Sequence, residues 1–298
     1  MNVRGLFHLL VVYIVWGSTY LAIRIAVREG AGFPPFTMSG MRIAAASIVL
    51  LLWAWSKRES FRLSRRQAIT LAASAVLLWV GGNGMVAWAE KTVDSGYAAL
   101  LVAAMPMWVA IMESIIDGKR PSSRLIGALL IGLVGIAVLN GPVILEGSVG
   151  SLVGAAALVF AGMSWGAGSL LQRRRPVPVG PEVSSGYQQV FGAIGLMIAA
   201  LLTGEPKPTP TPEAWAAWGY LAIFGSVFAF TSFVKALRLL PTNIVMTYAY
   251  VNPVIAVFLG WIILGEQITL WTAAGTMLVV LGVMGVFHEK ARERKTTS

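Results

Sequence analysis

The chain has 298 residues, of which 57% are hydrophobic and only 12% charged, with no cysteine and a net charge of +10. A mean hydropathy of +0.74 excludes an ordinary water-soluble domain, and the lack of cysteine excludes disulfides, thiolate metal sites and cysteine nucleophiles. The sequence therefore predicts an integral membrane protein. Because one helical crossing needs about 20 apolar residues, the chain has room for about ten crossings.

Apolar runs of membrane-spanning length follow one another along the whole chain. They occupy residues 5–27, 35–55, 67–89, 95–117, 123–140, 151–172, 184–203, 214–237, 243–264 and 269–287. We therefore predict an all-α membrane protein with ten transmembrane helices. The third and fourth runs are separated only by EKTVDSG at 90–96, and a helix that continued through it would reduce the count to nine. The first run lacks a following A-x-A-like cleavage site, so we expect a retained helix.

Lysine and arginine are distributed unevenly between the two sides of the membrane that these ten spans would cross. Eighteen of the 23 lie on the side that holds both chain ends, four lie on the other side, and Arg42 lies inside a span. Because positively charged loops stay in the cytoplasm, both termini are predicted to be cytoplasmic. The same distribution accounts for the net positive charge without nucleic-acid binding, which we do not expect.

A motif of the form W-G-x-x-x-L-x-x-R occurs twice, as WGSTYLAIR from Trp16 and as WGAGSLLQR from Trp165. A second set of matches has a similar offset and joins Pro106, Gly118 and Gly135 to Pro253, Gly265 and Gly282. Each half then carries five spans, and an odd number reverses the direction in which the second half enters the membrane. The pattern predicts inverted five-helix repeats at 1–142 and 149–288 and a cytoplasmic tail at 289–298. Such repeats are typical of transporters that work by alternating access.

Longer segments carry a resemblance to a known family. These are the early Trp-Gly pair, MSGMRIAAASIVLLL, NPVIAVFLGWIILGEQIT and AAGTMLVVLGVMGV. With them the chain resembles the EamA branch of the drug/metabolite transporter superfamily, and most of all the bacterial aromatic amino acid exporters. The resemblance implies a ten-helix exporter of the bacterial inner membrane, with a cavity between its halves. Gly265 and Glu266 match the family pattern, whereas the first half has Gly118 and Lys119.

Aromatic, amide and hydroxyl side chains near the span centres are the candidates for a substrate cavity. Ring faces can stack on an apolar side chain or hold an ammonium group, and neutral polar groups form hydrogen bonds that are easily broken. The alternative is that the aromatic residues form interfacial belts or pack helices. The candidates are Trp16, Ser18, Thr19, Trp79, Asn83, Tyr97, Trp108, Ser164, Trp165, Tyr248 and Asn252.

Two charged residues and two prolines lie within the predicted spans. Arg42 can receive a substrate carboxylate, pair with Glu90 or extend to the interface, and Glu113 near the cytoplasmic end favours an interfacial ion pair. No carboxylate falls clearly at the midplane, so the sequence does not support proton coupling through a buried acid. Pro106 and Pro253 should kink the fourth and ninth spans, as hinges or as static bends.

The sequence contains few of the residue patterns that enzyme catalysis requires. The only histidines, His8 and His288, lie near the two chain ends, and no metal-binding or nucleophilic motif is present. We therefore expect a non-enzymatic protein without metal or cofactor, whose partners are a small-molecule substrate and the lipid bilayer, and which acts as a monomer. The predicted function is export of aromatic and other apolar amino acids, with threonine and methionine as further candidates. The alternatives are export of another metabolite, a nucleotide sugar or a drug, and a membrane scaffold that transports nothing.

Overall fold

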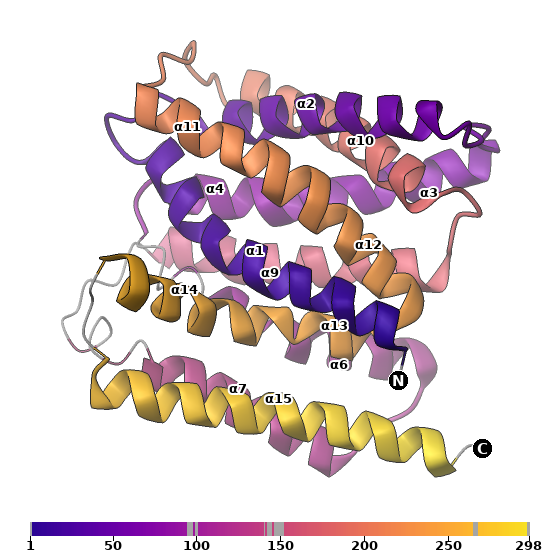
Figure 1. Ribbon diagram of the computed structural model, residues 1–298, viewed down its shortest axis with the longest axis vertical. Helices are drawn as coiled ribbons and strands as arrows, with labels where there is room; N and C mark the ends of the chain where they lie inside the picture. The colour runs from indigo at the N-terminus through magenta and orange to yellow at the C-terminus, as the bar shows by residue number, and fades with distance from the viewer. Residues whose placement is uncertain are drawn as a thin grey trace.

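The structure is a computed structural model that describes residues 2–93, 98, 101–139, 141, 145, 152–264 and 268–296. The regular elements of these residues are all helices, and they run roughly parallel or antiparallel in one bundle (Figure 1). Within these described residues, seven helices are long and apolar enough to cross a membrane, and Ser123–Leu139 is a shorter apolar helix. The chain is therefore an all-helical, multi-pass membrane protein, as its composition predicts.

The first half begins with two long helices, α1 (Val3–Val27) and α2 (Pro35–Ser56). The third span has three parts: α3 (Arg65–Ala75), the π-helix η1 (Val76–Gly84) and α4 (Met85–Ala89). It is followed by α6 (Met105–Asp117) and α7 (Ser123–Leu139). Local signals set several ends: Pro35 opens α2, Ser64 and Gln67 form a capping box, and Gly118 ends α6 in the left-handed conformation.

The second half repeats this pattern of one long helix after another. The first two are α9 (Leu152–Arg174) and α10 (Pro181–Leu202). The next span joins α11 (Pro212–Tyr220), the π-helix η2 (Leu221–Ala229) and α12 (Phe230–Leu239). The last elements are α13 (Thr242–Met246), α14 (Tyr248–Leu264) and α15 (Leu270–Thr296).

One local prediction differs from the structure. Pro106 does not kink a helix, because a turn at 103–104 precedes it and it lies in the first turn of α6, where its missing N–H has no helical acceptor to lose. Pro253 does lie inside its helix. Residues 289–296 of the predicted tail continue α15, and the Ser122 hydroxyl donates to Oε1 of Glu289 at 2.7 Å. A turn at 90–92 ends the third span, so its helix does not continue through the polar segment.

Close helix pairs form the outer layers of the bundle. In Figure 1, α7 and α15 lie together along the bottom, while α2 and α10 lie together along the top. Glycines allow the backbones of α7 and α15 to approach: a Cβ at Gly282 would lie 2.5 Å from the backbone nitrogen of Gly132. The helices α1, α9, α12 and α14 run between these layers and enclose the centre of the protein.

The two ends of the bundle differ in what they carry. Both chain termini lie at one end, on the right in Figure 1, and the connection from α1 to α2 lies at the other. At that second end, the proline-rich segment before α11 is held by hydrogen bonds from Thr209 N to Gly32 O (2.9 Å) and from Thr211 N to Ala31 O (3.0 Å). The end without the termini is called the distal end below.

Candidate functional site

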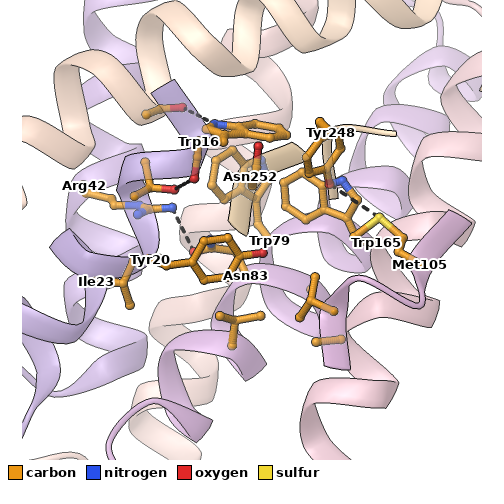
Figure 2. A pocket seen from close by; sticks show the side chains of 16 residues that line it. Trp16, Tyr20, Ile23, Arg42, Trp79, Asn83, Met105, Trp165, Tyr248 and Asn252 are labelled. Atoms are coloured by element: carbon orange, nitrogen blue, oxygen red, sulfur yellow. Dashed lines mark hydrogen bonds between the residues drawn. The ribbon is translucent and has the colours of Figure 1, made fainter. Parts of the chain in front are cut away.

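A cavity lies at the centre of the bundle, where residues from both halves of the chain meet (Figure 2). Its volume is about 70 Å³, which is space for about five water molecules. Ligand pockets are typically larger, roughly 300–1,000 Å³. The cavity is lined by Trp16, Thr19, Tyr20, Ile23, Arg42, Trp79, Gly82, Asn83, Val86, Val102, Met105, Ala161, Trp165, Gly225, Tyr248 and Asn252.

Helical periodicity brings the lining residues of α1 to one face. Trp16, Thr19, Tyr20 and Ile23 are spaced i, i+3, i+4 and i+7, so they form a single stripe along the helix. The two π-helices supply the opposite side through Trp79, Gly82 and Asn83 of η1 and Gly225 of η2. Wider helical turns of this kind are frequent at functional sites.

Five aromatic side chains line the cavity: Trp16, Tyr20, Trp79, Trp165 and Tyr248. Trp16 meets Trp165 edge to face with ring centroids 5.4 Å apart, and it meets Tyr248 in the same way at 5.0 Å. The Trp16 Nε1 donates a hydrogen bond to the main-chain oxygen of Gly225 at 3.1 Å, which fixes the indole. In contrast, the indole N–H groups of Trp79 and Trp165 are buried and have no acceptor among the described residues.

Arg42 supplies a positive charge beside these rings. Its Nη2 donates to Oδ1 of Asn83 at 2.9 Å, and its guanidinium carbon lies 5.7 Å from the centroid of the Trp79 ring. The residue is 4% exposed, so its side chain does not extend to the interface. Its Nε has no hydrogen-bond acceptor in the described part of the chain. Figure 2 shows the guanidinium reaching toward Asn83 at one side of the aromatic group.

Glu90 is a buried acid, and its burial was not predicted from the sequence. It follows Ala89 at the distal end of the third span and is 0% exposed. Neither carboxylate oxygen has a hydrogen-bond donor among the described residues. Arg24 donates from Nη1 to the main-chain oxygen of Glu90 at 2.5 Å, not to its carboxylate.

The structure brings many of the predicted cavity residues together. Of the predicted set, Trp16, Thr19, Trp79, Asn83, Trp165, Tyr248 and Asn252 line the cavity, and so does Arg42. With its amide nitrogen oriented toward them, Asn252 donates to the main-chain oxygens of Tyr13 (3.2 Å) and Tyr248 (3.0 Å).

Other predicted residues have different surroundings. The Ser18 hydroxyl donates to the main-chain oxygen of Val15 at 2.7 Å and contacts the Tyr220 hydroxyl at 2.5 Å. The Ser164 hydroxyl donates to the main-chain oxygen of Leu77 at 2.8 Å, which ties α9 to η1. Trp108 is half-buried on α6 and does not line the cavity.

The remaining predicted residues lie outside the cavity as well. Glu113 lines a separate cavity with Arg173, Arg174 and residues 241–243. Neither Pro106 nor Pro253 is among the lining residues. Tyr97, Gly265 and Glu266 lie outside the described residues.

Sequence reasoning missed several lining residues. Tyr20 and Ile23 continue the stripe that Trp16 begins, and this helical spacing was the signal that could have found them. Met105 receives a hydrogen bond from the Tyr248 hydroxyl to its Sδ at 3.4 Å. Nothing in the sequence distinguishes Met105 or Val102 from ordinary packing residues, because their place depends on the turn at 103–104.

Comparison with known proteins places the chain in a family. The model of the EamA-like transporter family matches twice, over residues 3–141 and 152–288. The uncharacterized inner membrane transporter YedA of Escherichia coli K12 is 35% identical over 285 residues, which cover 94% of this chain and 90% of that protein. The uncharacterized transporter YoaV of Bacillus subtilis is 22% identical over 283 residues, with 94% and 96% covered.

Two further matches extend this result. An S-adenosylmethionine/S-adenosylhomocysteine transporter of Chlamydia trachomatis serovar L2 is 24% identical over 295 residues, covering 94% of this chain and 88% of that protein. A solved crystal structure of a protein superposes with a TM-score of 0.80 at 20% identity and covers 98% of this chain and 99% of its own, which shows a shared fold. The chain therefore belongs to the EamA-like transporter family and is a membrane transporter.

Proposed function

We propose that the protein exports amino acids, preferring aromatic and other apolar side chains, across the bacterial inner membrane by alternating access. The observation that carries this proposal is the central cavity, in which buried Arg42 lies beside the Trp79 ring and which Trp16 and Trp165 also line. A guanidinium is suited to a carboxylate, and ring faces are suited to an aromatic or apolar side chain and to an ammonium group. The inner-membrane location is supported by the name of the relative YedA.

The proposal includes ten spans arranged as two inverted repeats, with both termini in the cytoplasm. Three features support it. The family model matches each half separately. The nine-residue π-helices begin at Val76 and Leu221, in corresponding spans of the two halves. Each of the paired prolines also lies in a helix that directly follows a turn, at 103–104 before the helix of Pro106 and at Thr247 before the helix of Pro253.

The small volume of the cavity supports alternating access. At about 70 Å³ it is too small for an aromatic amino acid. A substrate enters only when the halves separate on one side, and closure on the other side prevents a continuous pore. The rings of Trp79 and Phe230, with centroids 4.7 Å apart, and of Trp165 and Phe233, at 5.7 Å, pack α12 against the cavity. We propose that these contacts close the side of the cavity that faces the termini.

One alternative substrate class has its own support. A relative covering nearly the whole chain is named as an S-adenosylmethionine/S-adenosylhomocysteine transporter. S-adenosylmethionine is itself an amino acid with a purine ring and a sulfonium cation, and an aromatic lining suits both groups. Another metabolite, a nucleotide sugar or a drug remains the broader alternative, and a scaffold that transports nothing is the alternative from outside transport.

The proposal is tested by counterflow in proteoliposomes. Vesicles loaded with an excess of one unlabelled solute receive a trace of radiolabelled phenylalanine, and transient accumulation reports exchange through the protein. We expect accumulation with tryptophan, phenylalanine and methionine inside, and none with uridine diphosphate glucose. Accumulation of labelled S-adenosylmethionine without any of phenylalanine would favour the alternative, and no accumulation of any solute by inserted protein would refute the transport proposal for these classes.

A further inference from the structure

Glu90 lies one helical turn beyond Val86, which lines the cavity. The hydrogen bond from Glu90 N to Val86 O (2.9 Å) is the α-helical bond between residues four apart, so the two side chains lie on the same side of the end of the third span. Its carboxyl group is fully buried and accepts no hydrogen bond from the described residues. An ionised carboxylate without hydrogen bonds is strongly unfavourable in such a place, whereas a protonated one is much less so.

The groups around Glu90 come from the two neighbouring N-terminal helices. Arg24 and Tyr20 on α1 and Arg42 on α2 interact with it electrostatically. The helix α9 also packs against α4, but its residues at the distal end, 152–162, have no ionisable side chain. Neither guanidinium donates to the carboxylate: Arg24 Nη1 is directed to main-chain oxygens of Glu90 and Val93, and Arg42 Nη2 to Asn83.

Two acceptors are therefore available to Arg42, the amide oxygen of Asn83 and the carboxylate of Glu90. In this structure it is held by Asn83 inside the cavity, while its Nε and both Glu90 oxygens are left without hydrogen-bond partners in the described part of the chain. Arg42 and Glu90 also interact electrostatically, so an ion pair with Glu90 is the alternative to the contact with Asn83.

We propose that Glu90 is a proton-binding site and that Arg42 links it to the cavity. While Arg42 is held by Asn83, a carboxylate oxygen of Glu90 carries a proton taken from water. When Arg42 turns to Glu90, that proton returns to water and the ion pair replaces it. A substrate carboxylate that holds Arg42 in the cavity therefore favours protonation of Glu90, so substrate and proton bind together and each raises the affinity for the other. This last step rests on the proposed function, and the binding of the proton does not.

Infrared spectroscopy of the purified protein in liposomes, without any substrate, tests the proton site directly. A protonated carboxyl absorbs apart from the ionised carboxylates and the amide bands. We expect such a band at pH 7 in the wild type and in Glu29→Gln, which removes an exposed glutamate at the same end of the bundle. The band should be lost in Glu90→Gln. A wild-type spectrum without the band, or a band that persists in Glu90→Gln, would overturn the proposal.

The link through Arg42 is tested by titrating the same band in two variants with opposite expected shifts. Arg42→Gln removes the competing cation, so the band should persist to a pH higher by about one unit or more. Asn83→Ala releases Arg42 toward Glu90, so the band should disappear at a lower pH than in the wild type. Arg28→Gln, at an exposed arginine, should leave the titration unchanged. Shifts of the same sign in both variants, or none, would refute the link, and because no substrate is present the result is independent of what the protein transports.

Discussion

Trp16 and Trp165, the first residues of the two copies of W-G-x-x-x-L-x-x-R, meet edge to face at the centre of the protein with ring centroids 5.4 Å apart. Both are buried, and both line the central cavity. The repeated motif thus places equivalent side chains from the two halves in one contact. If the halves move relative to each other during transport, this contact is one that must change.

Replacing Arg42 should weaken the binding of amino acids through their carboxylate. Hydrogen bonds to charged groups contribute about 1.5–3 kcal/mol, so Arg42→Gln should raise the Kd for L-tryptophan roughly 10- to 100-fold. Scintillation proximity binding on purified protein measures this change. Tryptamine, which lacks the carboxylate, should compete equally weakly against wild type and variant. An equal loss for tryptamine and tryptophan would show that Arg42 acts on the shape of the cavity and not on the carboxylate.

Replacing Gly282 should separate α15 from α7. A Cβ there would meet the backbone of Gly132 at 2.5 Å, and a backbone atom cannot rotate out of the way. Gly282→Ala should therefore lower the apparent Tm by several degrees in a detergent unfolding assay. Gly127→Ala in α7 is the matched control, because nothing lies within 4 Å of a Cβ at that position. There the helical preference of alanine should leave the Tm unchanged or slightly higher. Equal Tm values for the two variants would contradict the close packing of these helices.

Cysteine labelling should place the distal end outside the cell. The chain has no cysteine of its own, so a single introduced thiol reports one position. Lys207→Cys, in the exposed segment before α11, should react with a membrane-impermeant maleimide in intact cells. Ser60→Cys, exposed in the connection from α2 to α3, should react only after the membrane is permeabilised. The reverse pattern would show that the termini face outward.

Much of the fold could be predicted from the sequence because its signals are local. The span limits at Pro35 and Ser64 follow from proline and capping chemistry, and the structure agrees with both. The turn at 103–104 carries no such signal, since it lies in an apolar run of alanine and valine, and so Pro106 was expected to bend a helix that in fact begins beside it. The π-helices were not predicted either, because their wider turns depend on packing between spans.

The site was predicted in part for a similar reason. Trp16, Trp79 and Asn83 stand out by residue type at span centres, and the structure places them around one cavity. Tyr20 could have been found from its spacing to Trp16 on α1. The burial of Glu90 could not, because it depends on how α1, α2 and α9 cover the end of the third span, and the sequence alone does not specify that packing.

The most direct test of the central claim is the initial rate of L-tryptophan uptake by proteoliposomes that contain wild type, Trp16→Ala or Trp55→Ala at equal protein content. Trp55 is the control because it is 72% exposed on α2 and does not line the cavity. We predict saturable uptake by wild type and Trp55→Ala and at least a tenfold lower rate in Trp16→Ala, on the order of 1.4 kcal/mol or more, because the indole and its bond to Gly225 shape the cavity. Uptake by Trp16→Ala at the wild-type rate would contradict the claim that substrate passes through this cavity.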